Sequence, residues 1–236
     1  MSGHSSMRRF LSPLWRFALT AVVGVVLITL VWSQVSRWAA YPVGLMAKAM
    51  LEETAPRWIR SVQAPPGELV QVDSAISVAN AQTGGRRIEI SMLAEPGRYA
   101  YGLPIFLALM LASRGSAGRG WRTLVGYALL LPVQAFSLVM FLLMELVRAA
   151  QRDARLLKIT MGQLEAIVYG FQVGTLVLPT LVPVLIWLWL ERRFVNEVLV
   201  SAWRESLAPA APTVQPEPPL AEPATEGLPV SDKASV

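Results

Sequence analysis

Four long apolar runs, separated by loops that carry arginine, constrain this chain more than any other feature. They cover residues 17–32, 99–113, 124–143 and 167–190. A helix rises about 1.5 Å per residue, so most of these runs approach or reach the thickness of a hydrocarbon core of roughly 30 Å. The whole chain is 54% hydrophobic, above the roughly 45–50% of a soluble domain. The sequence predicts an integral membrane protein that is mainly α-helical, with about four transmembrane helices.

The composition restricts the chemistry that the chain can perform. It contains no cysteine, and its only histidine is His4, which lies in a polar leader before the first apolar run. No phosphate-binding glycine loop, metal-spaced His/Glu cluster or Ser/Lys pair is present. We therefore expect no enzyme activity and no catalytic, cofactor-binding or metal site. The net charge is +5, but the arginines form short clusters beside apolar runs, which indicates a lipid bilayer and not nucleic acid as the partner.

These arginine clusters predict the topology. Arg16 and its neighbours precede the first run, the loop 114–122 follows the second, and Arg192 and Arg193 follow the fourth. Four crossings would place all three clusters on the cytoplasmic side, together with both termini. The basic segment 145–158 is an exception, and we interpret it as an amphipathic segment on the outer surface. A cleaved signal peptide is the alternative for the first run, but its core is longer than usual and no clean cleavage site follows, so an uncleaved anchor is favoured.

The segment between the first two runs has two different periodicities. Residues 35–60 are amphipathic and contain Pro42 and Pro56, which is typical of an interfacial helix or of a helix packed on a small domain. Alternation around a turn at 80–85 then predicts a β-hairpin with one apolar face. The residues of that face are Val70, Val72, Ile76, Val78, Ile88, Ile90 and Met92. Two strands are marginal in water, so the preceding helix, the membrane or a partner must cover this face, and we favour the helix.

The predicted organisation follows from these patterns. It comprises a cytoplasmic basic leader (1–16), transmembrane helices (17–34, 99–113, 123–145, 166–190), an extracytoplasmic amphipathic helix and β-hairpin (35–98), a cytoplasmic basic loop (114–122), an extracytoplasmic amphipathic segment (146–165) and a cytoplasmic tail (191–236). The tail is rich in proline and alanine and is predicted to be disordered, because it has little apolar surface to bury.

Polar residues in or near the spans are candidates for function, because they are costly in a bilayer. Gln134 follows Pro132, so its amide is expected to satisfy backbone groups freed by the proline or to bond a neighbouring helix. Glu145 and Glu165 lie near span ends, and their spacing does not require them to converge as an acid/base pair. The last span carries two glycines and two prolines, which favours a kinked, closely packed helix.

Three short motifs occur in order along the later spans. Tyr101-Gly102-Leu103-Pro104 opens the second, Leu131-Pro132-Val133-Gln134 lies in the third, and Tyr169-Gly170-Phe171-Gln172, Leu178-Pro179 and Pro183-Val184 lie in the fourth. Behind an N-terminal anchor and an outer β segment, this arrangement resembles the exosortase H-associated membrane protein family, over roughly residues 15–194.

The resemblance implies a bacterial inner-membrane accessory of exosortase H, a transpeptidase-like enzyme that processes proteins with a C-terminal sorting signal. Exosortases resemble enzymes that use Cys, Arg and His, which this chain lacks in its spans, so we expect a noncatalytic scaffold whose partner is the enzyme or its sorted substrate. A small transporter or channel subunit is the alternative. The candidate structural or partner-contact residues are Tyr101, Gly102, Pro104, Pro132, Gln134, Tyr169, Gln172, Pro179 and Pro183.

Overall fold

The computed structural model describes residues 13–79, 87–113, 118–150 and 157–200. Within these ranges, three helical stretches are long and apolar enough to cross a membrane. The first is α1 (Pro13–Ala39) and the second is α4 (Arg119–Ala149). The third is continuous from Met161 to Leu190 and consists of α6 (Met161–Gln172), the π-helical turn η5 (Val173–Val177) and α7 (Leu178–Leu190).

The second predicted span is shorter than expected. Its helix, α3 (Gly102–Ala112), has 11 residues, which rise about 16 Å, or roughly half of a hydrocarbon core. The chain before it forms the 3-10 turn η3 (Pro96–Arg98) instead of a further helical turn. Proline and glycine in that turn disfavour regular helix. The structure therefore supports three candidate membrane-spanning helices plus a short apolar helix, and it does not establish a fourth full span.

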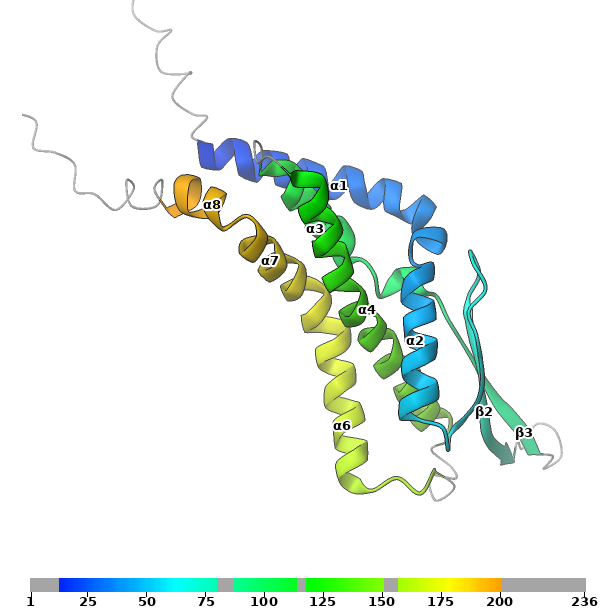
Figure 1. Cartoon of the computed structure of the whole chain (residues 1–236). Helices are drawn as coiled ribbons and strands as arrows, with labels where there is room; N and C mark the ends of the chain where they lie inside the picture. Colours follow the sequence, from blue (N-terminus) through cyan, green and yellow to red (C-terminus); the bar gives the residue numbers. More distant parts are fainter. Residues whose placement is uncertain (1–12, 80–86, 114–117, 151–156, 201–236) are drawn as a thin grey trace, which may run out of the picture.

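The helix ends gather at one end of the bundle (Figure 1). Phe17, near the start of α1, stacks on Trp187 of α7 with ring centroids 5.6 Å apart. The indole Nε1 of Trp187 donates to Ser113 Oγ, just after α3, at 3.4 Å. The chain then continues through α8 (Arg192–Phe194) and the π-helical segment η6 (Val195–Val200), so helix extends beyond residue 190, where the tail was predicted to begin.

The opposite end carries α2 (Tyr41–Thr54) and a small antiparallel sheet with strand order β1-β2-β3. The strands are β1 (Ile59–Gln63), β2 (Val70–Ala79) and β3 (Arg87–Ala94). The hairpin prediction was therefore incomplete, because a third strand pairs with β2. The amphipathic segment 35–60 is likewise divided among the end of α1, α2 and the first residues of β1. The predicted turn at 80–85 lies outside the described residues.

One face of the sheet packs inside the protein. Val70, Val72, Ile76 and Met92 are buried there, whereas Ile90 is half-buried. A Cβ on Gly44 of α2 would lie 3.2 Å from Val70 Cγ2, so α2 passes close to this face. Buried residues of α2, α4 and the sheet belong to one hydrophobic core. The preceding helix thus covers the apolar face, as favoured from the sequence, and α4 contributes to the same core.

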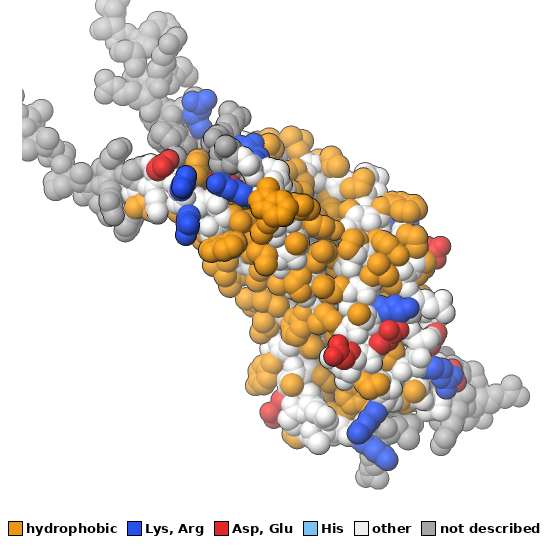
Figure 2. Space-filling view, in the orientation of Figure 1, with side chains coloured by type: hydrophobic (Ala, Val, Ile, Leu, Met, Phe, Trp, Pro, Cys, Tyr) orange, Lys and Arg blue, Asp and Glu red, His pale blue; other side chains and the backbone are white. Residues whose placement is uncertain are grey.

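The visible surface has a broad hydrophobic band between charged regions (Figure 2). Lysine, arginine, aspartate and glutamate side chains gather toward the α8 end and over the lower half of this view, and hydrophobic side chains cover the area between them. Many apolar residues of α1 and α7 are exposed, among them Leu30 and Trp189. An exposed apolar surface of this extent is typical of a chain whose solvent is lipid.

Other predicted segments are described only in part. The helix α4 continues to Ala149, past the predicted end of the third span at residue 145. Most of the leader (1–12), residues 151–156 of the predicted amphipathic segment and the tail from residue 201 lie outside the described residues.

Candidate functional site

The candidate residues of the second and fourth spans meet where α3 begins. A Cβ on Gly102 would lie 2.7 Å from the carbonyl oxygen of Pro179 and 2.8 Å from Pro183 Cγ. Only a residue without a side chain allows the backbones of α3 and α7 to approach this closely. We call the cluster of Tyr101, Gly102, Gln134, Pro179 and Pro183 the α3 junction.

Tyr101 contacts the π-helical turn of the last span. Its hydroxyl donates to the backbone carbonyl of Thr175 at 3.3 Å. In an α-helix that carbonyl would accept from the N–H of residue 179, but Pro179 has none. The tyrosine thus supplies a donor at the point where proline removes one. Since π-helical turns and prolines both bend helices, the contact stabilises the bend between α6 and α7 (Figure 1).

Gln134 serves the irregular chain that precedes α3. Its side chain is buried, and its Nε2 donates to the Ala100 carbonyl at 3.4 Å. Its Oε1 has no hydrogen-bond partner among the described residues. Backbone that is not in regular helix needs such donors inside a membrane protein. The amide therefore bonds the irregular backbone before α3, and this bond goes neither to the turn before Pro132 nor to a neighbouring helix, the two roles expected for it.

The other four candidates are not part of the contacts that define the α3 junction. Pro104 is buried in the first turn of α3, and Pro132 is exposed on α4. Tyr169 and Gln172 both lie on the exposed side of α6. The structure thus brings five of the nine candidates together, with Pro104 two residues farther along α3 from Gly102, and places the other three elsewhere.

Several close contacts were not predicted from the sequence. Arg122 Nη1 lies 3.2 Å from Glu191 Oε1, and the glutamate side chain is only 2% exposed. A Cβ on Gly126 would lie 2.1 Å from Phe106 Cζ, so α4 and α3 are in tight contact there. Glu191 could have been suspected from the sequence, because it is the charged residue directly after the last apolar run. Its partner, 69 residues away, could not be identified from local pattern.

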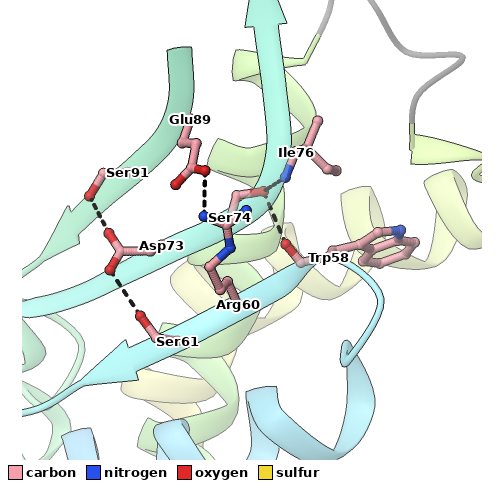
Figure 3. A network of polar contacts seen from close by, with 8 residues as sticks. All are labelled: Trp58, Arg60, Ser61, Asp73, Ser74, Ile76, Glu89 and Ser91. Atoms are coloured by element: carbon pink, nitrogen blue, oxygen red, sulfur yellow. Dashed lines mark hydrogen bonds and ion pairs between the residues drawn. The ribbon is translucent and has the colours of Figure 1, made fainter. Parts of the chain in front are cut away.

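A polar network covers the outer face of the sheet (Figure 3). Asp73 of β2 accepts hydrogen bonds from Ser61 of β1 and Ser91 of β3, both at 2.9 Å, and from Gln71 at 3.1 Å. These bonds, first that of Gln71, lower the pKa of Asp73 below its ordinary value. An ionised carboxylate that is already bonded is a weak base. The network therefore joins the three strands and does not resemble an acid/base site.

The described residues offer no arrangement typical of a metal or paired-carboxylate site. Glu145 pairs with Arg148 at 2.6 Å on the same helix, and Glu165 is exposed on α6. No group of three or more histidine, aspartate or glutamate side chains in the described ranges could hold a metal ion. What the geometry does provide is close helix packing, with side-chain hydrogen bonds to backbone carbonyls at the α3 junction.

Comparison with known families decides the assignment. The sequence model of the exosortase H-associated membrane proteins matches residues 11–194. The chain belongs to this family. The match confirms the resemblance inferred from the motifs. No curated protein and no solved structure matches the chain.

The region matched by the family contains all of the candidate site residues. It extends from the start of α1 to the end of α8, and so includes the α3 junction, the sheet and the ion pair between Arg122 and Glu191. The name of the family links the protein to exosortase H and suggests a membrane protein partner.

Proposed function

We propose that this protein is a noncatalytic accessory of exosortase H, and that it binds a membrane partner through the outer side of α6. The observation that carries the proposal is the pair Tyr169 and Gln172. Both are exposed, and only a small part of the apolar stretch Met161–Leu190 that contains them is buried inside the protein. They are three residues apart and lie on the same side of the helix. Neither side chain has a hydrogen-bond or ion-pair partner among the described residues.

Their depth makes the exposure costly. Along the path of the helix from Leu190, next to the charged residues at the α8 end, Gln172 is about 27 Å away and Tyr169 about 32 Å away at the usual helical rise. The π-helical turn and the bend between α6 and α7 make their depths smaller than these path lengths. A hydrocarbon core of roughly 30 Å would therefore contain Gln172 and place Tyr169 near its outer boundary. An unpaired amide at this depth is unfavourable in lipid. Contact with a polar group on a partner helix would satisfy it.

The noncatalytic role rests on the composition and on how the polar groups are used. The chain has no cysteine, and His4 is its only histidine, so it cannot supply the Cys and His that exosortase-type chemistry requires. A transporter would need polar groups that converge on a substrate path. At the α3 junction, Tyr101 and Gln134 instead bond backbone carbonyls of the same protein. A scaffold that presents the outer side of α6 accounts for both observations.

We further infer that the protein lies in a bacterial inner membrane with both termini in the cytoplasm. The bundle end where α1 begins carries several arginines: Arg16, Arg119, Arg122, Arg192 and Arg193. Their position together supports a single positively charged side of the protein. Alkaline phosphatase fused after Arg193 is expected to be inactive, and a fusion after Asp73 active. Activity from the first fusion would contradict this orientation.

The partner contact is tested by replacing Gln172 with leucine. We expect Gln172→Leu to weaken binding of exosortase H by about three- to eighteenfold, seen as a lower amount co-purifying with the tagged protein, because an interhelical hydrogen bond in a membrane contributes roughly 0.6–1.7 kcal/mol. The protein itself should accumulate normally, since the side chain is exposed in the isolated fold.

Thr180→Val is the matched control on the same span. Thr180 is exposed, but its hydroxyl already donates to the carbonyls of Leu176 and Val177 in its own helix, so we expect unchanged partner recovery. Equal recovery with Gln172→Leu and with the unsubstituted protein would exclude this face as the contact. A loss with Thr180→Val as well would indicate a general effect on the span.

A further inference from the structure

An exposed apolar stripe runs along α1 to its outer end. Leu27, Val31, Val35 and Trp38 are spaced by four, four and three residues, which places them on one side of the helix. All are exposed, from 44% at Val35 to 68% at Trp38. Within a membrane-spanning helix such a stripe faces lipid, and a tryptophan at its end is typical of the membrane–water boundary.

The stripe continues onto the sheet. The turn between β1 and β2 lies beside the end of α1 (Figure 1), where Gly67 has a φ of +79°. A Cβ on Gly67 would lie 3.0 Å from the Trp38 indole ring. The glycine thus fits both the left-handed turn and the close approach of the ring. The membrane-boundary tryptophan and the sheet therefore lie in direct contact.

Two leucines extend this surface along the sheet. Leu93 is 60% exposed and Leu69 is 44% exposed. Gln71 pairs with Leu93 in register, and all three line a shallow groove of about 430 Å³ beside Arg37. Farther along the same outer face the residues are polar, including Asp73 and its hydrogen-bonding serines. The outer face thus changes from polar to apolar toward the end of α1.

We propose that the Leu69 and Leu93 end of the sheet inserts into the lipid interface and holds the small extracytoplasmic domain against the bilayer. The occupant is lipid because this surface is continuous, through Trp38, with the lipid-facing stripe of α1. The rim charges are balanced, with Arg37 and Glu68 both lining the groove. Burial of apolar surface, and not attraction to anionic headgroups, is therefore the driving force.

The absence of cysteine from the sequence makes the test direct, because each introduced cysteine carries the only spin label. Leu69→Cys, Leu93→Cys, Val31→Cys and Glu89→Cys variants of the full chain are labelled and reconstituted in phosphatidylcholine vesicles. Accessibility to oxygen and to a water-soluble nickel complex is then compared. Labels at 69 and 93 are expected to favour oxygen, as the label at 31 does. The label at 89 should favour nickel, because Glu89 lies on the same face about 13 Å farther along β3.

Each outcome bears on the proposal. If the labels at 69 and 93 behave like the label at 89 while the label at 31 reports lipid, the sheet does not insert and a protein partner becomes the candidate occupant. If the label at 31 also favours nickel, α1 does not face lipid and the proposal fails with it. If insertion at 93 requires added phosphatidylglycerol, charge and not apolar burial drives it, and the proposal is wrong. Insertion in phosphatidylcholine alone supports it.

Discussion

Gly102→Val is expected to destabilise the purified protein by about 3 kcal/mol, because its Cβ would overlap the Pro179 carbonyl. The obstacle at 2.7 Å is backbone, which cannot move aside as a flexible side chain does. Relief would require α3 and α7 to separate, and that would also weaken the bond from Tyr101 to Thr175. The midpoint of thermal unfolding in detergent, followed by loss of the monodisperse peak in size-exclusion chromatography, measures the effect.

Gly120→Ala is the matched control for this substitution. Gly120 lies in the first turn of α4, and a Cβ there meets nothing within 4 Å. Alanine forms helix more readily than glycine, so unchanged or slightly higher stability is expected. Wild-type stability of Gly102→Val would mean that α3 and α7 are not in the close contact described here.

Val72→Asp is expected to lower the free energy of unfolding of the sheet and the helices packed on it by about 4 kcal/mol. Val72 is fully buried on β2, the central strand of the sheet, between its register partners Val62 and Met92. A carboxylate there would lose its water without gaining a partner. Two measurements check this. The steady-state abundance of the protein in the membrane should fall, and added protease should cleave the sheet faster in vesicles that expose it.

Gln63→Asp tests whether the effect depends on burial. Gln63 lies at the end of β1 and is exposed, so the same charge is expected to change stability by less than about 0.5 kcal/mol. Equal abundance of the two variants would show that Val72 does not face a packed core. It would also contradict the cover of the sheet by α2 and α4.

The family assignment was accessible from the sequence because the motifs that suggested it are local. Tyr101-Gly102, Pro132 with Gln134, and Pro179 with Pro183 each lie within one apolar run. The family match over residues 11–194 agrees with that resemblance. Their roles were not accessible in the same way. That Gly102 touches Pro179, or that the Tyr101 hydroxyl replaces a missing backbone donor, depends on how two helices cross.

The incomplete predictions have specific physical causes. The segment 99–113 is apolar throughout, so hydropathy cannot distinguish a full span from the 11-residue helix that the structure shows. The strand β1 is short, and its apolar residues Ile59 and Val62 are brought inward by a register shift between Ile59 and Ser61. Such an irregularity breaks the simple alternation that identifies a strand from sequence.

The sequence by itself determined that this is a membrane protein of its family, with apolar helices, a β element between the first two apolar runs and arginine clusters beside those runs. These properties depend on the composition and periodicity of each segment. The tertiary structure decided the length of α3, the third strand, the pairing of Arg122 with Glu191, and the contact of Trp38 with the turn at Gly67. These features join residues far apart in the chain, and the approach of two elements depends on the packing of both.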